Sequence, residues 1–422
     1  MTTDFPQSSC ADPEDKHRLS IEMARQAIEQ QITAITDWHY CPLRDALNRV
    51  LAENIVSPLA VPAHANSAMD GYAFRHTDLQ TGNHDTQLTM VGEAFAGKPY
   101  TGKTIQAGQC VRVMTGAILP TGCDSIIMQE QVSAHQQNIR FASSPPLGEH
   151  VRYAGEDIQL GDTILVTGRR LTPADIGLLA SLGVAEVAVK RRLKVAFFST
   201  GDELRSIGQT LALGQIYDSN RYTISSMLAR LDVSCYDMGV VADDPEALRR
   251  TMKAASQQAD VVITSGGVSV GEADYVKTIL SELGRIGFWK IAMRPGRPLA
   301  FGQIDNALFF GLPGNPVSVM VTFYQFVAPA LRRLIGEIAM PPLTMQVRCT
   351  DPIRKRPGRF EYQRGILATD ETGNTIVRVT GQQGSGILRS MSSADCFILL
   401  DERCDGLPAN SLVTVQPFMG LI

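Results

Sequence analysis

A short apolar run that enters a glycine-rich turn constrains the fold of this chain most strongly. Residues 260–264 (DVVIT) have the composition of a buried parallel strand, and residues 265–271 (SGGVSVG) form the turn after it. Helical spacing of apolar residues follows, from Ala273 to Leu283. Such a turn leaves backbone N–H groups unpaired at a helix start, and glycine lets an anion approach them. We interpret it as a phosphate-binding turn, with these candidate residues: Gly266, Gly267, Ser269 and Gly271.

On this turn alone, glycines that serve only the backbone geometry are an equally good explanation. Residues 267–271 (GVSVG) also match the nucleophile elbow of α/β-hydrolases, which requires an acid and then a histidine later in the chain. All seven histidines lie in the first 150 residues, so the sequence argues against such a hydrolase. The turn also lacks the Lys-Ser/Thr ending of a P-loop and does not match the dinucleotide-binding fingerprint.

The alternation of strand and helix patterns from about residue 190 to 338 predicts an α/β domain with a mostly parallel sheet. Strands are expected at 193–199, 235–241, 260–264 and 307–310. Ligands of such sheets bind at the carboxyl ends of the strands. The turn at 265–271 lies at that edge, as does the Leu-Pro-Gly-Asn-Pro turn at 312–316, where Pro313 and Gly314 precede another helix.

The rest of the chain divides into regions with helix-like and β-like sequence patterns. Apolar spacing predicts helices over 21–35 and 43–54, and Thr172, Pro173 and Asp175 indicate a capped helix start. Between them lie short β-like runs separated by turns, so we expect a β-rich insertion at 58–153 within a discontinuous helical domain, 18–57 and 154–189. Residues 339–422 carry only short β-like runs after Pro341-Pro342, which predicts an all-β last domain.

Several carboxylates follow strands of the predicted sheet. Carboxylates beside a phosphate-binding turn repel phosphate unless a hard cation such as Mg²⁺ lies between them. Helix capping explains Asp244 fully, and solvated loop charge is the competing explanation for the others. Because they cluster, we favour a metal and pyrophosphate site with these candidates: Asp202, Glu203, Asp243 and Asp274.

The turn Arg294-Pro295-Gly296-Arg297-Pro298 presents two guanidinium groups that suit bidentate contacts with an oxyanion. Simple surface charge is an equally good explanation. Lys277 and Lys290 are weaker candidates, since both fit a solvated helix face or strand end.

Composition limits the partners. The chain has 422 residues and a net charge of −4, which gives no global field for nucleic acid or a membrane. The first 17 residues lack a signal-peptide core, and no apolar run is long enough to span a bilayer. Eight scattered cysteines without a C-x-x-C pair indicate reduced thiols. We expect a cytoplasmic protein.

Six motifs occur in order along the chain: NSAMDGYA (66–73), VMTGAILPTGCDSIIMQE (113–130), GED (155–157), STGDEL (199–204), TSGGVSVGEADYVK (264–277) and GLPGNPVS (311–318). Together they resemble the motifs of the molybdopterin molybdenumtransferases, the MoeA proteins related to the gephyrin E domain. The resemblance extends from about Ser20 to Phe418.

The resemblance implies an elongated, four-domain homodimer. It implies a molybdopterin-binding three-layer α/β domain, a discontinuous dimerisation domain and a barrel-like C-terminal domain. The implied reaction inserts molybdate into adenylylated molybdopterin and releases AMP and molybdenum cofactor, with Mg²⁺ required. The adenylyltransferase that makes the substrate and the enzymes that accept the cofactor are possible partners.

The resemblance also assigns residues. The implied catalytic positions are Asp70, Thr115, Asp157, Glu203, Asp243 and Asp274, of which Glu203, Asp243 and Asp274 would hold the metal. Asp70 and Thr115 would act on the site of the other subunit. The implied substrate-binding positions add Lys277, Pro313, Gly314, Arg364 and Ser385 to the glycine turn and to Arg294 and Arg297.

Two departures from the family pattern concern charge. Where the family usually has K-P-G-K-P, this chain has Arg294 and Arg297. Planar guanidinium groups thus replace the point charges of two lysines. The usual Phe-Asp before NSAMDGYA is His64-Ala65, which removes a carboxylate. Two other functions stay open: an adenylyltransferase acting on molybdopterin, and a non-catalytic cofactor carrier or scaffold. The carboxylates argue against the carrier, because phosphate binding alone gains nothing from them.

Overall fold

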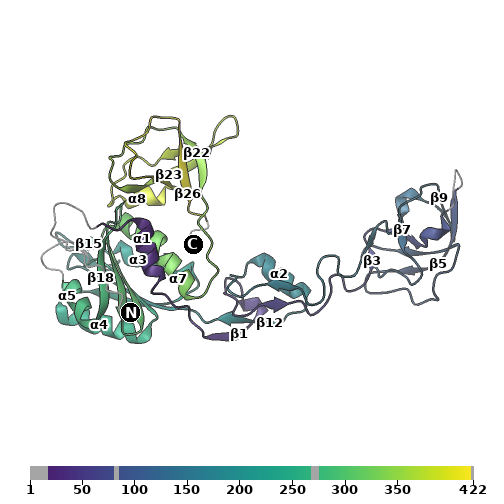
Figure 1. Cartoon of the computed structure of the whole chain (residues 1–422), viewed down its shortest axis with the longest axis horizontal. Helices are drawn as coiled ribbons and strands as arrows, with labels where there is room; N and C mark the ends of the chain where they lie inside the picture. Colours follow the sequence, from purple (N-terminus) through teal and green to yellow (C-terminus); the bar gives the residue numbers. More distant parts are fainter. Residues whose placement is uncertain (1–17, 80–84, 268–274, 420–422) are drawn as a thin grey trace.

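The computed structural model describes residues 18–79, 85–267 and 275–419. Figure 1 shows an elongated molecule with an α/β domain and a C-terminal barrel at one end and the inserted β-rich domain at the other. The discontinuous domain lies between them. This multidomain α/β plus β architecture confirms the predicted fold class, whereas the domain boundaries stay a prediction.

The α/β domain has a six-stranded sheet in the order β16-β13-β17-β21-β20-β18, with the first four strands parallel. β18 and β20 pair antiparallel. The strands are β13 (Lys194–Thr200), β16 (Ser234–Val241), β17 (Val261–Ser265), β18 (Gly284–Lys290), β20 (Pro298–Ile304) and β21 (Ala307–Leu312). β14 (Leu204–Arg205) and β15 (Ile216–Tyr217) form a separate parallel pair.

Helices cover both faces of this sheet, which makes the predicted three layers. On one face, Ile224 of α3 and Val321 of α6 pack against Phe197 and Ile263. On the other face, Leu248 of α4 and Leu280 of α5 pack against the opposite side chains of the same strands. The helices are α1 (Ile21–Glu29), α3 (Ser219–Ala229), α4 (Pro245–Gln258), α5 (Tyr275–Leu283), α6 (Pro316–Thr322), the π-helical turn Phe323–Val327 and α7 (Ala328–Leu334).

The first helix is shorter than its apolar spacing suggests and packs on the α/β domain. Ser20 caps α1 as predicted, but the helix ends at Glu29, so Ile32 and Ile35 lie beyond it. Ala24 and Ile28 are buried in the core that contains α7. The α1 segment therefore joins the α/β domain in space.

The discontinuous domain contains two short antiparallel strand pairs and one helix. Its elements are β1 (Trp38–Pro42), the single 3-10 turn Leu43–Asp45, β2 (Ile55–Val56), β11 (Thr163–Leu165), α2 (Pro173–Ser181) and β12 (Glu186–Lys190). The prediction of a helix over 43–54 was therefore wrong. Val50 and Leu51 are fully buried, but they lie in extended chain. Val50 forms a bridge with Arg170, and Leu51 forms one with Val189 of β12. The predicted cap of α2 is confirmed, because Thr172 and Asp175 form a capping box and Pro173 begins the helix.

The inserted domain has a six-stranded sheet in the order β7-β4-β6-β5-β9-β8 and a separate β3–β10 pair. Its strands are β3 (Asn66–Ser67), β4 (Gly71–Phe74), β5 (Thr86–Ala94), β6 (Gln109–Val113), β7 (Ser125–Met128), β8 (Ser133–His135), β9 (Asn138–Phe141) and β10 (Val151–Arg152). Two 3-10 turns, His76–Asp78 and Gln129–Gln131, complete it.

The C-terminal sheet closes on itself, because β23 pairs with both β24 and β25. Its elements are β22 (Met345–Cys349), β23 (Phe360–Thr369), β24 (Thr375–Val379), α8 (Leu388–Ser392), β25 (Cys396–Leu400) and β26 (Ser411–Pro417). β19 (Met293–Arg294) of the α/β domain adds to this sheet through parallel pairing with β23. The arginine turn therefore belongs to both domains.

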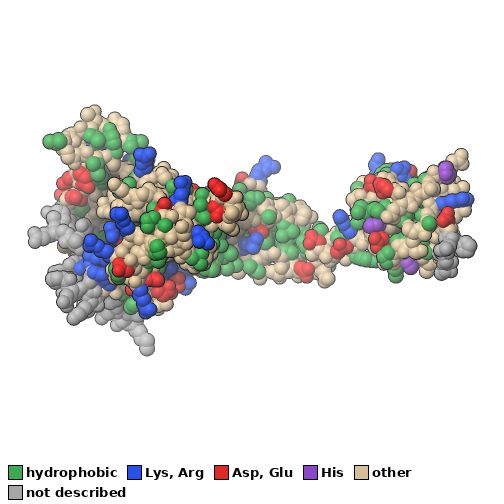
Figure 2. All heavy atoms as spheres, turned by 90° about the horizontal axis from the view of Figure 1, so that it is seen from above, with side chains coloured by type: hydrophobic (Ala, Val, Ile, Leu, Met, Phe, Trp, Pro, Cys, Tyr) green, Lys and Arg blue, Asp and Glu red, His purple; other side chains and the backbone are tan. Residues whose placement is uncertain are grey.

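The narrow middle of the molecule carries exposed apolar side chains (Figure 2). Trp38 is 51% exposed and Tyr40 is 59% exposed on β1, and Val56 is exposed on β2. Among the described residues, no helix is both long and apolar enough to cross a membrane.

Candidate functional site

Three predicted carboxylates follow the carboxyl ends of the parallel strands, and two of these residues contact each other. The Thr200 hydroxyl at the end of β13 donates a hydrogen bond to Oδ1 of Asp243, which follows β16. The Asp243 N–H donates to Oδ1 of Asp202 at 3.2 Å. Glu203 folds back over Gly201, where an added Cβ would lie 2.5 Å from Oε2 of Glu203. All three carboxylates are exposed at one rim.

The described part of the glycine turn lies against the same rim. Gly266 and Gly267 have φ values of +91° and +67°, which favour glycine. A Cβ at Gly266 would lie 2.4 Å from the carbonyl oxygen of Thr200. The Gly266 N–H donates to Leu312 O at 3.1 Å, which ties the turn to β21. Three predicted site residues, Ser269, Gly271 and Asp274, lie outside the described residues. The side chain of Lys277 in α5 is also outside them.

Asn220, in the first turn of α3, joins the two predicted phosphate turns, and the sequence did not single it out. Its Nδ2 donates to Ser265 Oγ at 2.9 Å and to Gly314 O at 2.7 Å. Gly314 is exposed at the mouth of its turn, whereas Pro313 is buried. Because an asparagine near a helix start is explained by local capping, sequence alone gave no signal for this bridge.

The predicted oxyanion arginines lie where the α/β domain meets the barrel. The side chain of Arg294 is 61% exposed, and its Nη1 lies 3.4 Å from Oε1 of Glu361 on β23. Arg297 is half-buried, and its carbonyl oxygen accepts from Ile291 N at 2.8 Å. The turn is held from both sides, since Phe360 N also donates to Ala292 O at 3.0 Å.

Arg364 is buried within the barrel, where its guanidinium is engaged by the protein. Nε donates to Ser390 Oγ at 3.0 Å, and Nη2 donates to Gly384 O at 3.2 Å. Burial, and then the nearby charge of Arg294, lower the pKa of Arg364 to about 10. Ser385 lies in the loop that Arg364 holds, and its carbonyl oxygen accepts from Val317 N in α6 at 3.1 Å.

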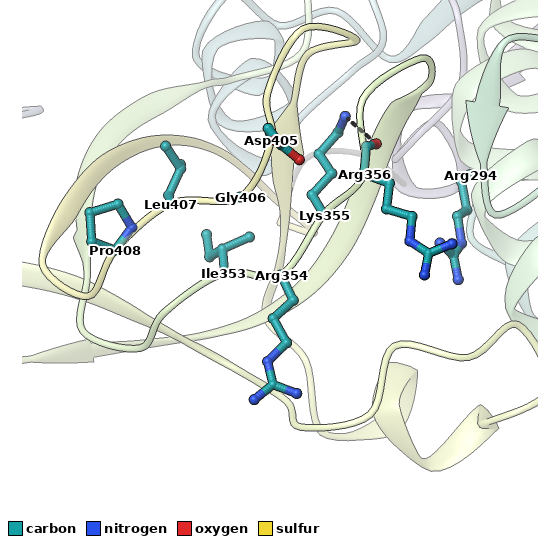
Figure 3. Close-up of a pocket in the computed structure, with 9 residues that line it drawn as sticks. All are labelled: Arg294, Ile353, Arg354, Lys355, Arg356, Asp405, Gly406, Leu407 and Pro408. Carbon is teal, nitrogen blue, oxygen red and sulfur yellow. Dashed lines mark hydrogen bonds between the residues drawn. The ribbon is translucent and has the colours of Figure 1, made fainter.

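More arginines surround this turn than the sequence motifs identified. Burial, followed by the charges of Arg297 and Arg294, lowers the pKa of Arg359. Burial, followed by the charges of Arg359 and Arg297, likewise lowers the pKa of Arg18. Arg354 and Arg356 line a pocket with Arg294 (Figure 3). The run IRKRPGR at 353–359 was the available signal, but a dense basic run is also typical of a solvated surface.

Asp70 and Thr115 contact each other in the inserted domain. Oδ1 of Asp70 accepts from the Thr115 N–H at 2.7 Å and from its hydroxyl at 2.8 Å. These bonds lower the pKa of Asp70. Asp157 is exposed near the base of this domain, with its N–H bound to Val61 O at 3.0 Å. Within one chain, this domain and the α/β domain lie at opposite ends of the molecule (Figure 1).

The departure at His64-Ala65 leaves the fold of the inserted domain intact. Ala65 packs against the core of that domain, and its carbonyl oxygen accepts from Leu119 N at 2.9 Å. His64 is exposed.

A preassembled metal cage is absent from the described residues, where no three His, Cys, Asp or Glu side chains gather. The rim carboxylates nevertheless fit Mg²⁺, because that ion is commonly bound by one or two carboxylates together with water and substrate phosphates. Glu203 and Asp243 are exposed oxygen donors of the required kind.

Family models match nearly the whole chain. The model described as "MoeA N-terminal region (domain I and II)" matches residues 19–183. "Probable molybdopterin binding domain" matches residues 196–333, and "MoeA C-terminal region (domain IV)" matches residues 346–418.

The chain is 43% identical over 406 residues to a molybdopterin molybdenumtransferase of Haemophilus influenzae. The aligned region covers 96% of this chain and 100% of that relative. It is 36% identical to that of Nostoc sp., covering 92% of this chain and 89% of the relative. The crystal structure of the molybdopterin biosynthesis moeA protein from Pyrococcus horikoshii matches with a TM-score of 0.83 at 28% sequence identity. The match covers 95% of this chain and 100% of that chain. The chain therefore belongs to the MoeA family of molybdopterin molybdenumtransferases.

Proposed function

We propose that this transferase inserts molybdate into adenylylated molybdopterin and releases AMP and molybdenum cofactor in a Mg²⁺-dependent reaction. The observation that carries the proposal is the convergence at one rim of Gly266, Asp243 and Gly314, which come from three different strand ends. Glycine turns supply N–H donors for phosphate, and the carboxylates need a cation beside it. A pyrophosphate-containing substrate satisfies both requirements.

The residues of the chain bind and orient this substrate. Gly266, Gly267 and Gly314 would hold phosphate oxygens through the backbone, with Ser269, Gly271 and Lys277 as further candidates. Asp243 and Glu203, with Asp274, would hold Mg²⁺, which neutralises the charge of the pyrophosphate when bound. The Thr200 hydroxyl fixes the orientation of Asp243 through the hydrogen bond that it donates.

The arginine turn would hold molybdate. Arg294 is exposed and suited to an oxyanion, and Arg297 lies on the same turn. Arg364 has its donors occupied by protein oxygens, so we assign it the role of positioning the loop of Ser385 against α6. The loop would then line the molybdate site from the barrel side.

A homodimer would complete the site. Asp70 and Thr115 lie far from the α/β rim within one chain (Figure 1), so they would act on the rim of the other subunit. The exposed apolar surface around Trp38 and Tyr40 on the middle domain supports an interface there. Asp157, near the base of the inserted domain, would act on the same side as Asp70. We further propose a cytoplasmic location, delivery of the pterin by its adenylyltransferase and handover to cofactor-accepting enzymes.

The direct test incubates purified protein with adenylylated molybdopterin, molybdate and Mg²⁺ and measures AMP. We expect AMP release that stops when the metal is chelated and resumes when Mg²⁺ is restored. Consumption of ATP without AMP release from the adenylylated pterin would identify an adenylyltransferase. Binding of the pterin without cleavage under any metal condition would identify a carrier.

A further inference from the structure

Gln325 lies at the junction of the α/β domain and the barrel, in the π-helical turn Phe323–Val327, and is 1% exposed. Its Oε1 accepts hydrogen bonds from Nη2 of Arg25 on α1 and from the hydroxyl of Tyr362 on β23, the latter at 3.3 Å. Its Nε2 donates to Oε1 of Gln416 on β26 at 2.9 Å. Gln325 therefore joins two helical segments of the α/β domain to two strands of the barrel.

The local sequence brings the backbone of Gln325 into the same network. In an α-helix the carbonyl oxygen of residue 325 would accept from the N–H of residue 329, but residue 329 is a proline and has none. Nε of Arg25 donates to this oxygen at 3.3 Å. Arg25 thus contacts both the backbone and the side chain of Gln325. Single π-helical turns inside α-helices are frequent at functional sites.

Polar and apolar contacts at this junction have different effects. Tyr324 stacks on Phe418 at the end of the barrel, with ring centroids 5.9 Å apart. Apolar burial of this kind favours association but is non-directional. Gln325, Tyr362 and Gln416 are at most 3% exposed, so a shift of the barrel that broke their hydrogen bonds would leave buried polar groups unpaired. The polar network therefore specifies the orientation of the barrel on the α/β domain.

The strand that this network holds, β23, also carries contacts of the barrel with the proposed molybdate site. Oε1 of Glu361 lies 3.4 Å from Nη1 of Arg294. Nη2 of Arg364 donates to the loop that contains Ser385 at 3.2 Å. Tyr362 lies between Glu361 and Arg364 on the same strand. A displacement of Tyr362 therefore moves both of these contacts.

We propose that Gln325 is a positioning residue for molybdate binding, because its hydrogen bonds fix β23, and with it Glu361 and Arg364, relative to the α/β domain. The inference rests on the proposed function, in which the arginine turn and the loop of Ser385 hold molybdate. The glycine turns and rim carboxylates that would hold the pyrophosphate and Mg²⁺ all lie within the α/β domain. A displaced barrel should therefore weaken the binding of molybdate and leave the binding of the pterin unchanged.

The test measures AMP release with molybdate and adenylylated molybdopterin varied in turn. Gln325→Met keeps an unbranched side chain of similar length but removes the partner of three buried polar groups. Its KM for molybdate should rise about tenfold or more, whereas its KM for the pterin should stay within about twofold of the wild-type value. Tyr362→Phe removes only one of the hydrogen bonds, so its KM for molybdate should rise about threefold.

Two further variants separate positioning from a general loss of stability. Gln325→Glu keeps an acceptor for both donors, and Gln416 can turn its amide to donate to the new carboxylate. This variant should therefore keep the wild-type KM for molybdate. Gln346→Met removes a hydrogen bond of 2.7 Å from Nε2 of an exposed glutamine to Thr414 Oγ1 within the barrel, and it should change neither KM.

The contradicting results are specific. An unchanged KM for molybdate in Gln325→Met would overturn the proposal, as would an equal rise in both KM values. The same rise in Gln325→Glu as in Gln325→Met would assign the effect to packing and overturn it too. If Gln325→Met does not fold, an unchanged KM for molybdate in Tyr362→Phe is the contradicting result. A wild type that releases no AMP counts against the proposed function alone, and equilibrium dialysis of molybdate against pterin-free protein then compares the same variants.

Discussion

At the scale of single residues, Asn220 bridges the two predicted phosphate turns through the hydrogen bonds that its Nδ2 donates. Asn220→Asp removes the Nδ2 donor and sets a carboxylate against Gly314 O, so the turns should separate. We expect kcat/KM to fall about tenfold or more, since two hydrogen bonds of roughly 1 kcal/mol each are lost. Thr223→Ala, which removes one hydroxyl bond to Ser219 O on the same helix, is the control and should retain activity. Equal activity of both variants would remove Asn220 from this role.

Local chemistry explains which residues the sequence could identify. Thr172 with Asp175, and Asp244 with Pro245, form helix starts from neighbouring residues, so their roles were readable from spacing. Asn220 acts between turns that lie far apart in sequence. Arg364 was identified from the family motif, but its burial within the barrel on β23 depends on strands that are distant in sequence. Neither arrangement leaves a periodic signal.

At the scale of elements, the turn after β17 is closed to any side chain at its first glycine. Gly266→Ala places a Cβ 2.4 Å from Thr200 O at a φ of +91°, so the end of β17 must shift away from β13. We expect a cost on the order of 1–3 kcal/mol and a marked loss of activity. Gly177→Ala in α2 is the matched control, because nothing lies within 4 Å of its added Cβ. Comparing AMP release and thermal unfolding of the two variants checks this prediction, and full activity of Gly266→Ala would contradict it.

The starts of β13 and β17 are joined by an ion pair. Burial would raise the pKa of Asp260, but hydrogen bonds from Arg191 at 2.7 and 2.8 Å and from Lys194 N outweigh it and lower that pKa. A lowered carboxyl pKa contributes stability above the unfolded value near 4 and loses it as the pH falls through the folded value.

Arg191→Gln should therefore lower the free energy of unfolding of the α/β domain by about 1–2 kcal/mol at pH 7. The difference in the free energy of unfolding between this variant and the wild type should become smaller as the pH falls below about 4. Trp289, buried in this domain, reports unfolding by fluorescence in a Trp38→Phe background. Arg192→Gln is the control, since that arginine is half-exposed in its pair with Asp232 and should cost less than about 1 kcal/mol. Equal losses at pH 7 would contradict the prediction.

Elements with a continuous apolar run were predicted well, and those that depend on distant partners were not. β7 and β17 carry apolar runs that match buried strands. Residues 43–54 have apolar spacing compatible with a helix, but Val50 and Leu51 form bridges with Arg170 and Val189, which lie far along the chain, and these bridges hold that part of the segment extended. The parallel pairing of β19 with β23 also joins distant segments, so the basic run at 353–359 did not by itself reveal that Arg354 and Arg356 line a pocket with Arg294.

At the scale of the whole molecule, the elongated shape separates the candidate residues into two groups. Asp70 and Thr115 lie in the inserted domain, whereas Asp243 lies at the opposite end of the same chain (Figure 1). If a dimer joins the two groups, each site takes one group from each subunit. A chain with a defective inserted domain and a chain with a defective rim can then form one intact site together.

Mixed dimers test this arrangement. Asp70→Asn and Asp243→Asn should each be nearly inactive alone, because every site of either homodimer lacks one carboxylate. Refolding them together in equal amounts should restore about one quarter of the wild-type activity, since half of the dimers are mixed and each has one intact site. The pair Asp70→Asn and Thr115→Val should restore none, because both changes fall in the inserted domain and each site of a mixed dimer carries one of them. Activity in neither mixture would place each site within a single chain.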